Sequence, residues 1–120
     1  MTKRNIVHIE IPTREAKESA AFYEKLFGWK IVRDDAMDYT MFDAHEGPGG
    51  GFSPLGENIA VGDVLFYVNS DDIEADLQRA VELGGEIAMP KTEIPSTGWF
   101  GMFKDQTGNI VGLYTGMNPE

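Results

Sequence analysis

A histidine and a glutamate lie two residues apart near the start of this chain, in the stretch NIVHIEIP at residues 5–12. His8 is one of only two histidines in the sequence. An imidazole can bind a metal ion or move a proton near neutral pH, and a neighbouring carboxylate can raise the imidazole pKa. His8 and Glu10 are therefore the candidate catalytic residues. The non-catalytic alternative is that His8 lines a cavity and only forms hydrogen bonds with ligand or water.

The pattern around His8 predicts a strand. Val7, Ile9 and Ile11 alternate with the residues between them and the pattern stops at Pro12, which is typical of a half-buried strand over residues 5–11. If the three apolar residues face a helix, His8 and Glu10 point to the opposite face. That helix is predicted between residues 13 and 28. Thr13 or a near neighbour would cap its start, and Gly28 would end it.

The order of elements after this helix occurs twice in the chain. Three short strands are predicted in WKIVRD, DYTMFDA and GGFSPL. The second half then gives a strand in DVLFYV, a helix in SDDIEADLQRAVELGG, and strands in EIAMP, WFGMFK and NIVGLYT. The sequence therefore predicts an α+β protein with one domain made of two β-α-β-β-β modules, residues 4–56 and 62–116.

Composition excludes several classes of function. The 120 residues contain no cysteine, so disulfides, thiolate metal sites and cysteine nucleophiles are excluded. A net charge of −10 opposes binding to nucleic acid. No apolar run is long enough to span a membrane, and the N-terminus lacks a secretory signal, so we expect no membrane association and a cytoplasmic location.

Four segments resemble the vicinal oxygen chelate superfamily, which includes glyoxalase I, extradiol dioxygenases and bleomycin-resistance proteins. These are HIEIP with AFYEKLFGW, GGGFSPL, DDIEADLQRAVELGGEI and FKDQTGNIVGLY, with Gln106 where proline is common in the family. The resemblance implies that the two modules form a curled eight-stranded mixed sheet, a half-barrel around a cavity, with the helices on the outer face. It also implies a homodimer.

Metal-dependent members of this superfamily hold one divalent cation with four side chains from four strands. Carried over position by position, His8 matches the first ligand, whereas Gly51 or Phe52, Leu65 and Gly112 stand at the other three. A cation of this kind needs at least three nitrogen or oxygen donors. We therefore expect no metal and no other cofactor.

Two functional hypotheses remain. The favoured one is metal-free binding of a small, partly aromatic organic ligand in the inter-module cavity. Its expected binding residues are His8, Glu10, Met41, Phe52, Leu65, Tyr67, Trp99, Gly112 and Tyr114. The alternative is an enzyme. It would be either a metal-dependent lyase or dioxygenase with a non-standard ligand set, or a metal-free isomerase that uses His8 and Glu10.

Overall fold

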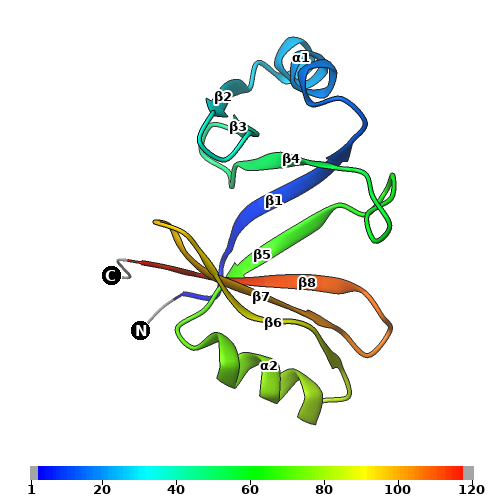
Figure 1. Cartoon of the computed structure of the whole chain (residues 1–120), viewed down its shortest axis with the longest axis vertical. Helices are drawn as coiled ribbons and strands as arrows, with labels where there is room; N and C mark the ends of the chain where they lie inside the picture. The colour runs from blue at the N-terminus through cyan, green and yellow to red at the C-terminus, as the bar shows by residue number, and fades with distance from the viewer. Residues whose placement is uncertain (1–2, 118–120) are drawn as a thin grey trace. The chain divides into compact units, whose positions relative to one another are not determined.

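The computed structural model describes residues 3–117, and within them eight strands and two helices follow one another in a repeated order. The elements are β1 (Ile6–Thr13), α1 (Ala16–Phe27), β2 (Lys30–Asp34), β3 (Tyr39–Asp43), β4 (Gly50–Pro54), β5 (Leu65–Asn69), α2 (Ile73–Glu82), β6 (Glu86–Ile94), β7 (Gly98–Lys104) and β8 (Ile110–Gly116). The α+β class and the two β-α-β-β-β modules predicted from the sequence are confirmed (Figure 1). No helix in the described part of the chain has the length and apolar character to cross a bilayer.

The chain divides into two compact units. One is His8–Leu65, and the other combines the segment up to Val7 with the chain from Phe66 onward. We call them the N-unit and the C-unit. The two residues Ile6 and Val7 at the start of β1 therefore group with the C-unit, whereas the rest of β1 belongs to the N-unit.

The N-unit contains four strands in the order β2-β3-β4-β1. β1 and β4 run parallel, with Ile9 opposite Gly50, and the other neighbours are antiparallel. The parallel pair requires a long connection, which α1, β2 and β3 supply. Figure 1 shows α1 joined to the end of β1.

Local sequence signals set both ends of α1. Glu15 caps the start by accepting a hydrogen bond from the backbone N–H of Lys17. Thr13 supports this turn by accepting from the backbone N–H of Glu15. The helix ends at Gly28, whose φ of 75° is left-handed and suits a residue without a Cβ. The predicted end at Gly28 is therefore confirmed, and the cap is a near neighbour of Thr13.

The core of the N-unit lies between α1 and one face of the sheet. Its most buried side chains are Ala20, Phe42 and Phe52, and Ile9 and Ile11 pack against them. The ring of Trp29 stacks on Phe42 with 4.6 Å between centroids. Because Ile9 and Ile11 face this core, the alternation along β1 places His8 and Glu10 on the sheet face away from α1, as predicted.

The C-unit repeats this arrangement with strand order β5-β8-β7-β6 and a parallel β5–β8 pair. α2 starts at the cap Asp72, which accepts from the backbone N–H of Ala75. Ile73 and Leu77 of α2 form a buried core with Leu113, against which Val68, Trp99 and Phe103 pack. The strand predicted in DVLFYV is shorter in the structure, because β5 begins at Leu65 and Val64 is 56% exposed.

Candidate functional site

Four polar side chains meet on the face of the N-unit sheet that lies away from α1. His8 and Glu10 come from β1, Tyr39 from the start of β3 and Ser53 from β4. We call these four residues the His8 cluster. β1 and β4 are parallel neighbours and β3 lies beyond β4, so three strands that are separated along the chain position one cluster.

The carboxylate of Glu10 lies at the centre of the His8 cluster. Its Oε2 lies 2.5 Å from Nε2 of His8 and accepts a hydrogen bond from the Tyr39 hydroxyl, while Oε1 accepts one from the Ser53 hydroxyl. The Tyr39 oxygen also lies 2.9 Å from Nε2 of His8. An ionised carboxylate only accepts hydrogen bonds, so beside ionised Glu10 it is Nε2 of His8 that carries the proton of this contact.

These hydrogen bonds keep Glu10 ionised. Burial of the Glu10 side chain acts to raise its pKa, but hydrogen bonds from His8, Ser53 and Tyr39 favour the charged form and outweigh it. The pKa of Glu10 therefore lies below its usual value. Only 15% of the Glu10 side chain is exposed, whereas 31% of the His8 side chain is. The cluster thus presents an imidazole to solvent and keeps the charge that orients it largely buried.

A glycine makes room for the Tyr39 ring. Gly51 lies opposite both Glu10 and Met41 in the sheet. A Cβ built on Gly51 would lie 1.9 Å from the Tyr39 hydroxyl oxygen and 2.1 Å from its Cζ. The ring therefore occupies the space of the side chain that Gly51 lacks, and this close approach brings the hydroxyl to Glu10.

The predicted binding residues of the N-unit do not all lie with the His8 cluster. Met41 shares the face of Tyr39 because the two residues are two apart in β3. Leu65 is partly buried at the start of β5. Phe52 lies on the opposite face and is 3% exposed in the α1 core.

The predicted residues of the C-unit also divide between two faces. Trp99 packs against the α2 core. Gly112 and Tyr114 flank the core residue Leu113 in β8 and so point away from α2. A Cβ on Gly112 would lie 2.4 Å from the Tyr67 ring, which places Tyr67 on that same face. The ligand-binding role of every residue in the predicted set stays a prediction.

Sequence reasoning missed Tyr39 and Ser53 as partners of Glu10. Ser53 is 43 residues from Glu10 and Tyr39 is 29 residues from it. Because Phe52 faces the core, alternation along the strand places Ser53 on the sheet face away from α1. Only the pairing of β1 with β4 brings it to Glu10. No local motif predicts that pairing.

The side chains at the four positions expected for the family's metal do not fit a divalent cation. His8 is held by Glu10 and Tyr39, and Gly51, Leu65 and Gly112 supply no side-chain donor. Within residues 3–117, no group of three or more His, Cys, Asp or Glu side chains could hold a metal ion.

Known proteins similar to this chain carry related descriptions. A "Glyoxylase-like domain-containing protein" of Didymella fabae is 28% identical over 115 residues, which cover 89% of this chain and 90% of that protein. "Putative glyoxylase CFP32" of Mycobacterium bovis is 26% identical over 113 residues, covering 88% of this chain. The match covers only 43% of that relative's length.

Solved structures show the same fold at low identity. Hypothetical protein BH1468 of Bacillus halodurans superposes with a TM-score of 0.73 and 13% identity, covering 99% of both chains. Methylmalonyl-CoA epimerase of Mycobacterium tuberculosis gives a TM-score of 0.70 and 11% identity, covering 94% of this chain and 88% of that one. The family profile described as the Glyoxalase/Bleomycin resistance protein/Dioxygenase superfamily matches residues 5–113. This chain therefore belongs to the glyoxalase/bleomycin resistance/dioxygenase superfamily.

Proposed function

We propose that this protein binds a small, partly aromatic organic ligand without a metal, on the sheet face of the N-unit that carries the His8 cluster. The observation that supports this proposal is the imidazole of His8, which is partly exposed and held by an ionised, mostly buried carboxylate. A fixed hydrogen-bonding group of this kind orients a ligand at little entropic cost. Met41 on the same face supplies an adaptable apolar contact.

Three matched aromatic probes test this proposal. We would titrate EDTA-treated protein with phenol, benzoate and benzylamine and follow the backbone amides by NMR. These probes share one ring and differ only in the polar group that the His8 cluster would recognise. We expect at least one probe to shift the amides of the cluster and of Met41 in a saturable manner. No saturable shift on this face with any of the three probes would contradict the proposal.

A pair of histidine variants provides the control. His8→Asn removes the imidazole of the cluster, whereas His45→Asn removes the other histidine, which is exposed in a loop. His45 has a φ of 67°, and asparagine tolerates this conformation. We expect His8→Asn to weaken binding of the probe by about tenfold, the loss of one charge-assisted hydrogen bond, and His45→Asn to leave it unchanged. Equal effects of the two variants would exclude His8 as the anchor.

A second function is supported by the carboxylate–imidazole pair itself. With the Nε2 proton directed at Glu10, the lone pair of neutral His8 resides on Nδ1, and Glu10 would stabilise the imidazolium formed when Nδ1 takes a proton. This favours metal-free proton transfer at a carbon beside a carbonyl group. Hydroxyacetone in D₂O is a suitable probe, because NMR follows exchange of its carbon-bound protons. His8→Asn should slow catalysed exchange by about 10²-fold. If the protein exchanges these protons no faster than buffer does, proton transfer is excluded and ligand binding stays the only proposed function.

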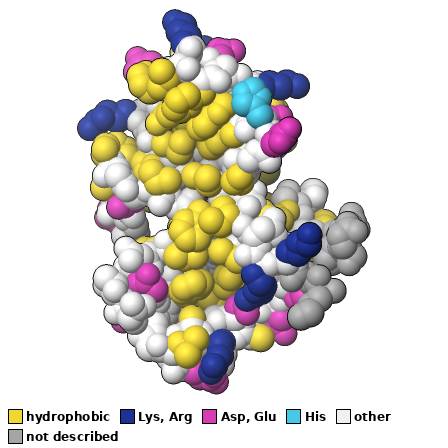
Figure 2. All heavy atoms as spheres, turned by 180° about the vertical axis from the view of Figure 1, so that it is seen from behind, with side chains coloured by type: hydrophobic (Ala, Val, Ile, Leu, Met, Phe, Trp, Pro, Cys, Tyr) yellow, Lys and Arg dark blue, Asp and Glu magenta, His cyan; other side chains and the backbone are white. Residues whose placement is uncertain are grey.

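Three further expectations complete the proposal. The chain is one domain of two modules, residues 4–56 and 62–116, it is cytoplasmic, and it forms a homodimer. Exposed large apolar side chains occur in both units (Figure 2), and Phe22 and Leu26 of α1 are 60% and 59% exposed. Such side chains are typical of surfaces that pair. Light scattering during size-exclusion chromatography measures the mass, and the mass of a monomer would contradict the homodimer.

A further inference from the structure

The outer side of α1 carries large apolar side chains that are exposed to solvent. Phe22 and Leu26 are both more than half exposed. They are four residues apart, so they lie next to each other on the helix, on the side that faces away from the buried Ala20. We call Phe22 and Leu26 the α1 patch. Exposed neighbouring side chains of this size are typical of surfaces that bind another protein.

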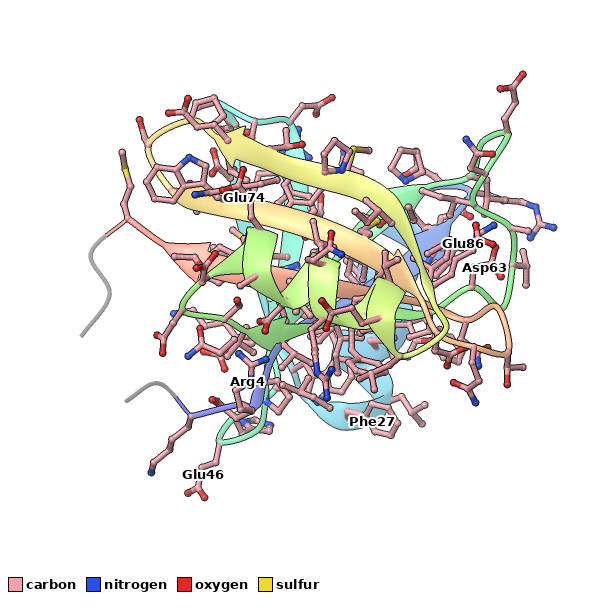
Figure 3. The ribbon with its side chains drawn as sticks, turned by 90° about the horizontal axis from the view of Figure 1, so that it is seen from below. Arg4, Phe27, Glu46, Asp63, Glu74 and Glu86 are labelled. Atoms are coloured by element: carbon pink, nitrogen blue, oxygen red, sulfur yellow. The ribbon has the colours of Figure 1, made fainter. Side chains whose placement is uncertain are left out.

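The charge of α1 suits contact with a second copy of the chain. Every copy has a net charge of −10, so two copies repel each other least where the touching surfaces are locally neutral. α1 contains two lysines and two glutamates, whose charges balance. α2 contains three acidic residues and one arginine, and Figure 3 shows Glu74 on its first turn. Of the two helices, α1 is therefore the one on which a second copy can dock.

The charged residues beside Phe22 determine how two α1 helices can pair. Glu18 lies four residues before Phe22 and Lys25 lies three residues after it, so all three share one side of the helix. In a parallel pair of helices, Glu18 would face Glu18 and Lys25 would face Lys25. In an antiparallel pair with a twofold axis at Phe22, Glu18 of one copy lies beside Lys25 of the other, within about 2 Å along the helix axis at a rise of about 1.5 Å per residue. The pattern is therefore complementary to itself only when the helices are antiparallel.

We propose that the protein pairs with a second copy of itself through the α1 patch, with the two helices antiparallel. Phe22 lies at the twofold axis, Leu26 packs beside it, and Glu18 of each copy pairs with Lys25 of the other. An aromatic side chain at the centre with charged residues around it is the usual arrangement of a protein interface. This inference rests on the homodimer proposed above and adds its surface and its symmetry.

Sedimentation equilibrium at several concentrations of the full chain measures the dissociation constant of the dimer. Phe22→Glu places two like charges at the twofold axis and should weaken dimerisation at least tenfold. Leu83→Glu is the matched control, because Leu83 is 66% exposed at the end of α2, and it should leave the dimer unchanged. An amide NMR spectrum checks that Phe22→Glu is folded. A folded Phe22→Glu protein that dimerises as tightly as the natural one would overturn the proposal.

An exchange of charges tests the antiparallel arrangement and leaves Phe22 in place. Glu18→Lys alone, or Lys25→Glu alone, puts like charges opposite each other at both symmetric positions and should weaken the dimer about tenfold. The two changes together restore opposite charges and should recover most of the lost affinity. Lys17→Glu with Glu24→Lys is the control on the same helix. These two residues lie about 140° and 160° around the helix from Phe22, so neither the single changes nor the pair should alter dimerisation.

The remaining outcomes separate this inference from the proposals above. Losses from Glu18→Lys and Lys25→Glu that add without recovery would overturn the antiparallel pairing. A dimer that is insensitive to every change in α1 would show that another surface pairs, and would overturn the inference while the homodimer stands. A natural protein that sediments as a monomer would contradict both. Failure of the aromatic probes at the His8 cluster would affect neither, because the cluster lies on the sheet face away from α1.

Discussion

Replacing Gly51 by alanine should disrupt the His8 cluster although none of its four residues is substituted. The new Cβ would lie 1.9 Å from the Tyr39 hydroxyl oxygen, far inside any van der Waals contact. The backbone of Gly51 is paired to β1 and β3 and cannot retreat easily. The Tyr39 ring must therefore move, and it must leave Glu10 and His8 as it does so.

The cost follows from the hydrogen bonds that Tyr39 loses. A hydrogen bond to a charged acceptor such as Glu10 contributes about 1.5–3 kcal/mol. The lower backbone entropy of alanine in the unfolded chain offsets about 0.4–1 kcal/mol of this loss. We therefore expect Gly51→Ala to lower the free energy of unfolding by about 2 kcal/mol. The pKa of Glu10 should rise toward its usual value, because one of the donors that lower it is removed.

Denaturant unfolding measures this cost, and Gly47→Ala is its control. A Cβ at Gly47 would meet only the Ala44 carbonyl oxygen, at an ordinary 3.7 Å, so this variant should stay within about 1 kcal/mol of the natural protein. Since Gly51→Ala acts through the ring, adding it to Tyr39→Ala should cost almost nothing more. Fully additive effects, or a Gly51→Ala protein as stable as the natural one, would refute this reasoning.

Acid should weaken the fold through Glu10. Because its pKa is lower in the folded state, its stabilisation is fully present above its ordinary pKa of 4.5 and is lost as the pH falls through the lower folded value. In the Glu10→Gln variant, the free energy of unfolding should therefore fall less between pH 6 and about pH 3 than it does in the natural protein. An unchanged dependence on pH would contradict this. In the C-unit, Leu77→Ala should cost about 2–5 kcal/mol in denaturant unfolding, since Leu77 is 3% exposed. Leu26→Ala at an exposed position should cost far less, and equal losses would disprove the assigned core.

The amino-acid sequence by itself determined the features that depend on neighbouring residues. Alternation along residues 5–11 placed Ile9 and Ile11 toward the core and His8 and Glu10 on the other face, because successive side chains of a strand point to opposite sides. The helix stop at Gly28 was equally local, since the left-handed backbone there suits glycine. The two β-α-β-β-β modules followed from such signals repeated in order.

The tertiary structure decided which distant residues meet. The phase of alternation in β4 and β7 is ambiguous in short apolar runs, so only packing placed Phe52 and Trp99 in the cores. Ser53 and Tyr39 reach Glu10 because β4 pairs with β1 and with β3 in a particular register. Ile73 and Leu77 meet Leu113 because α2 packs over β8. Strand register and helix packing minimise the free energy of the whole fold, and no short stretch of sequence contains that information.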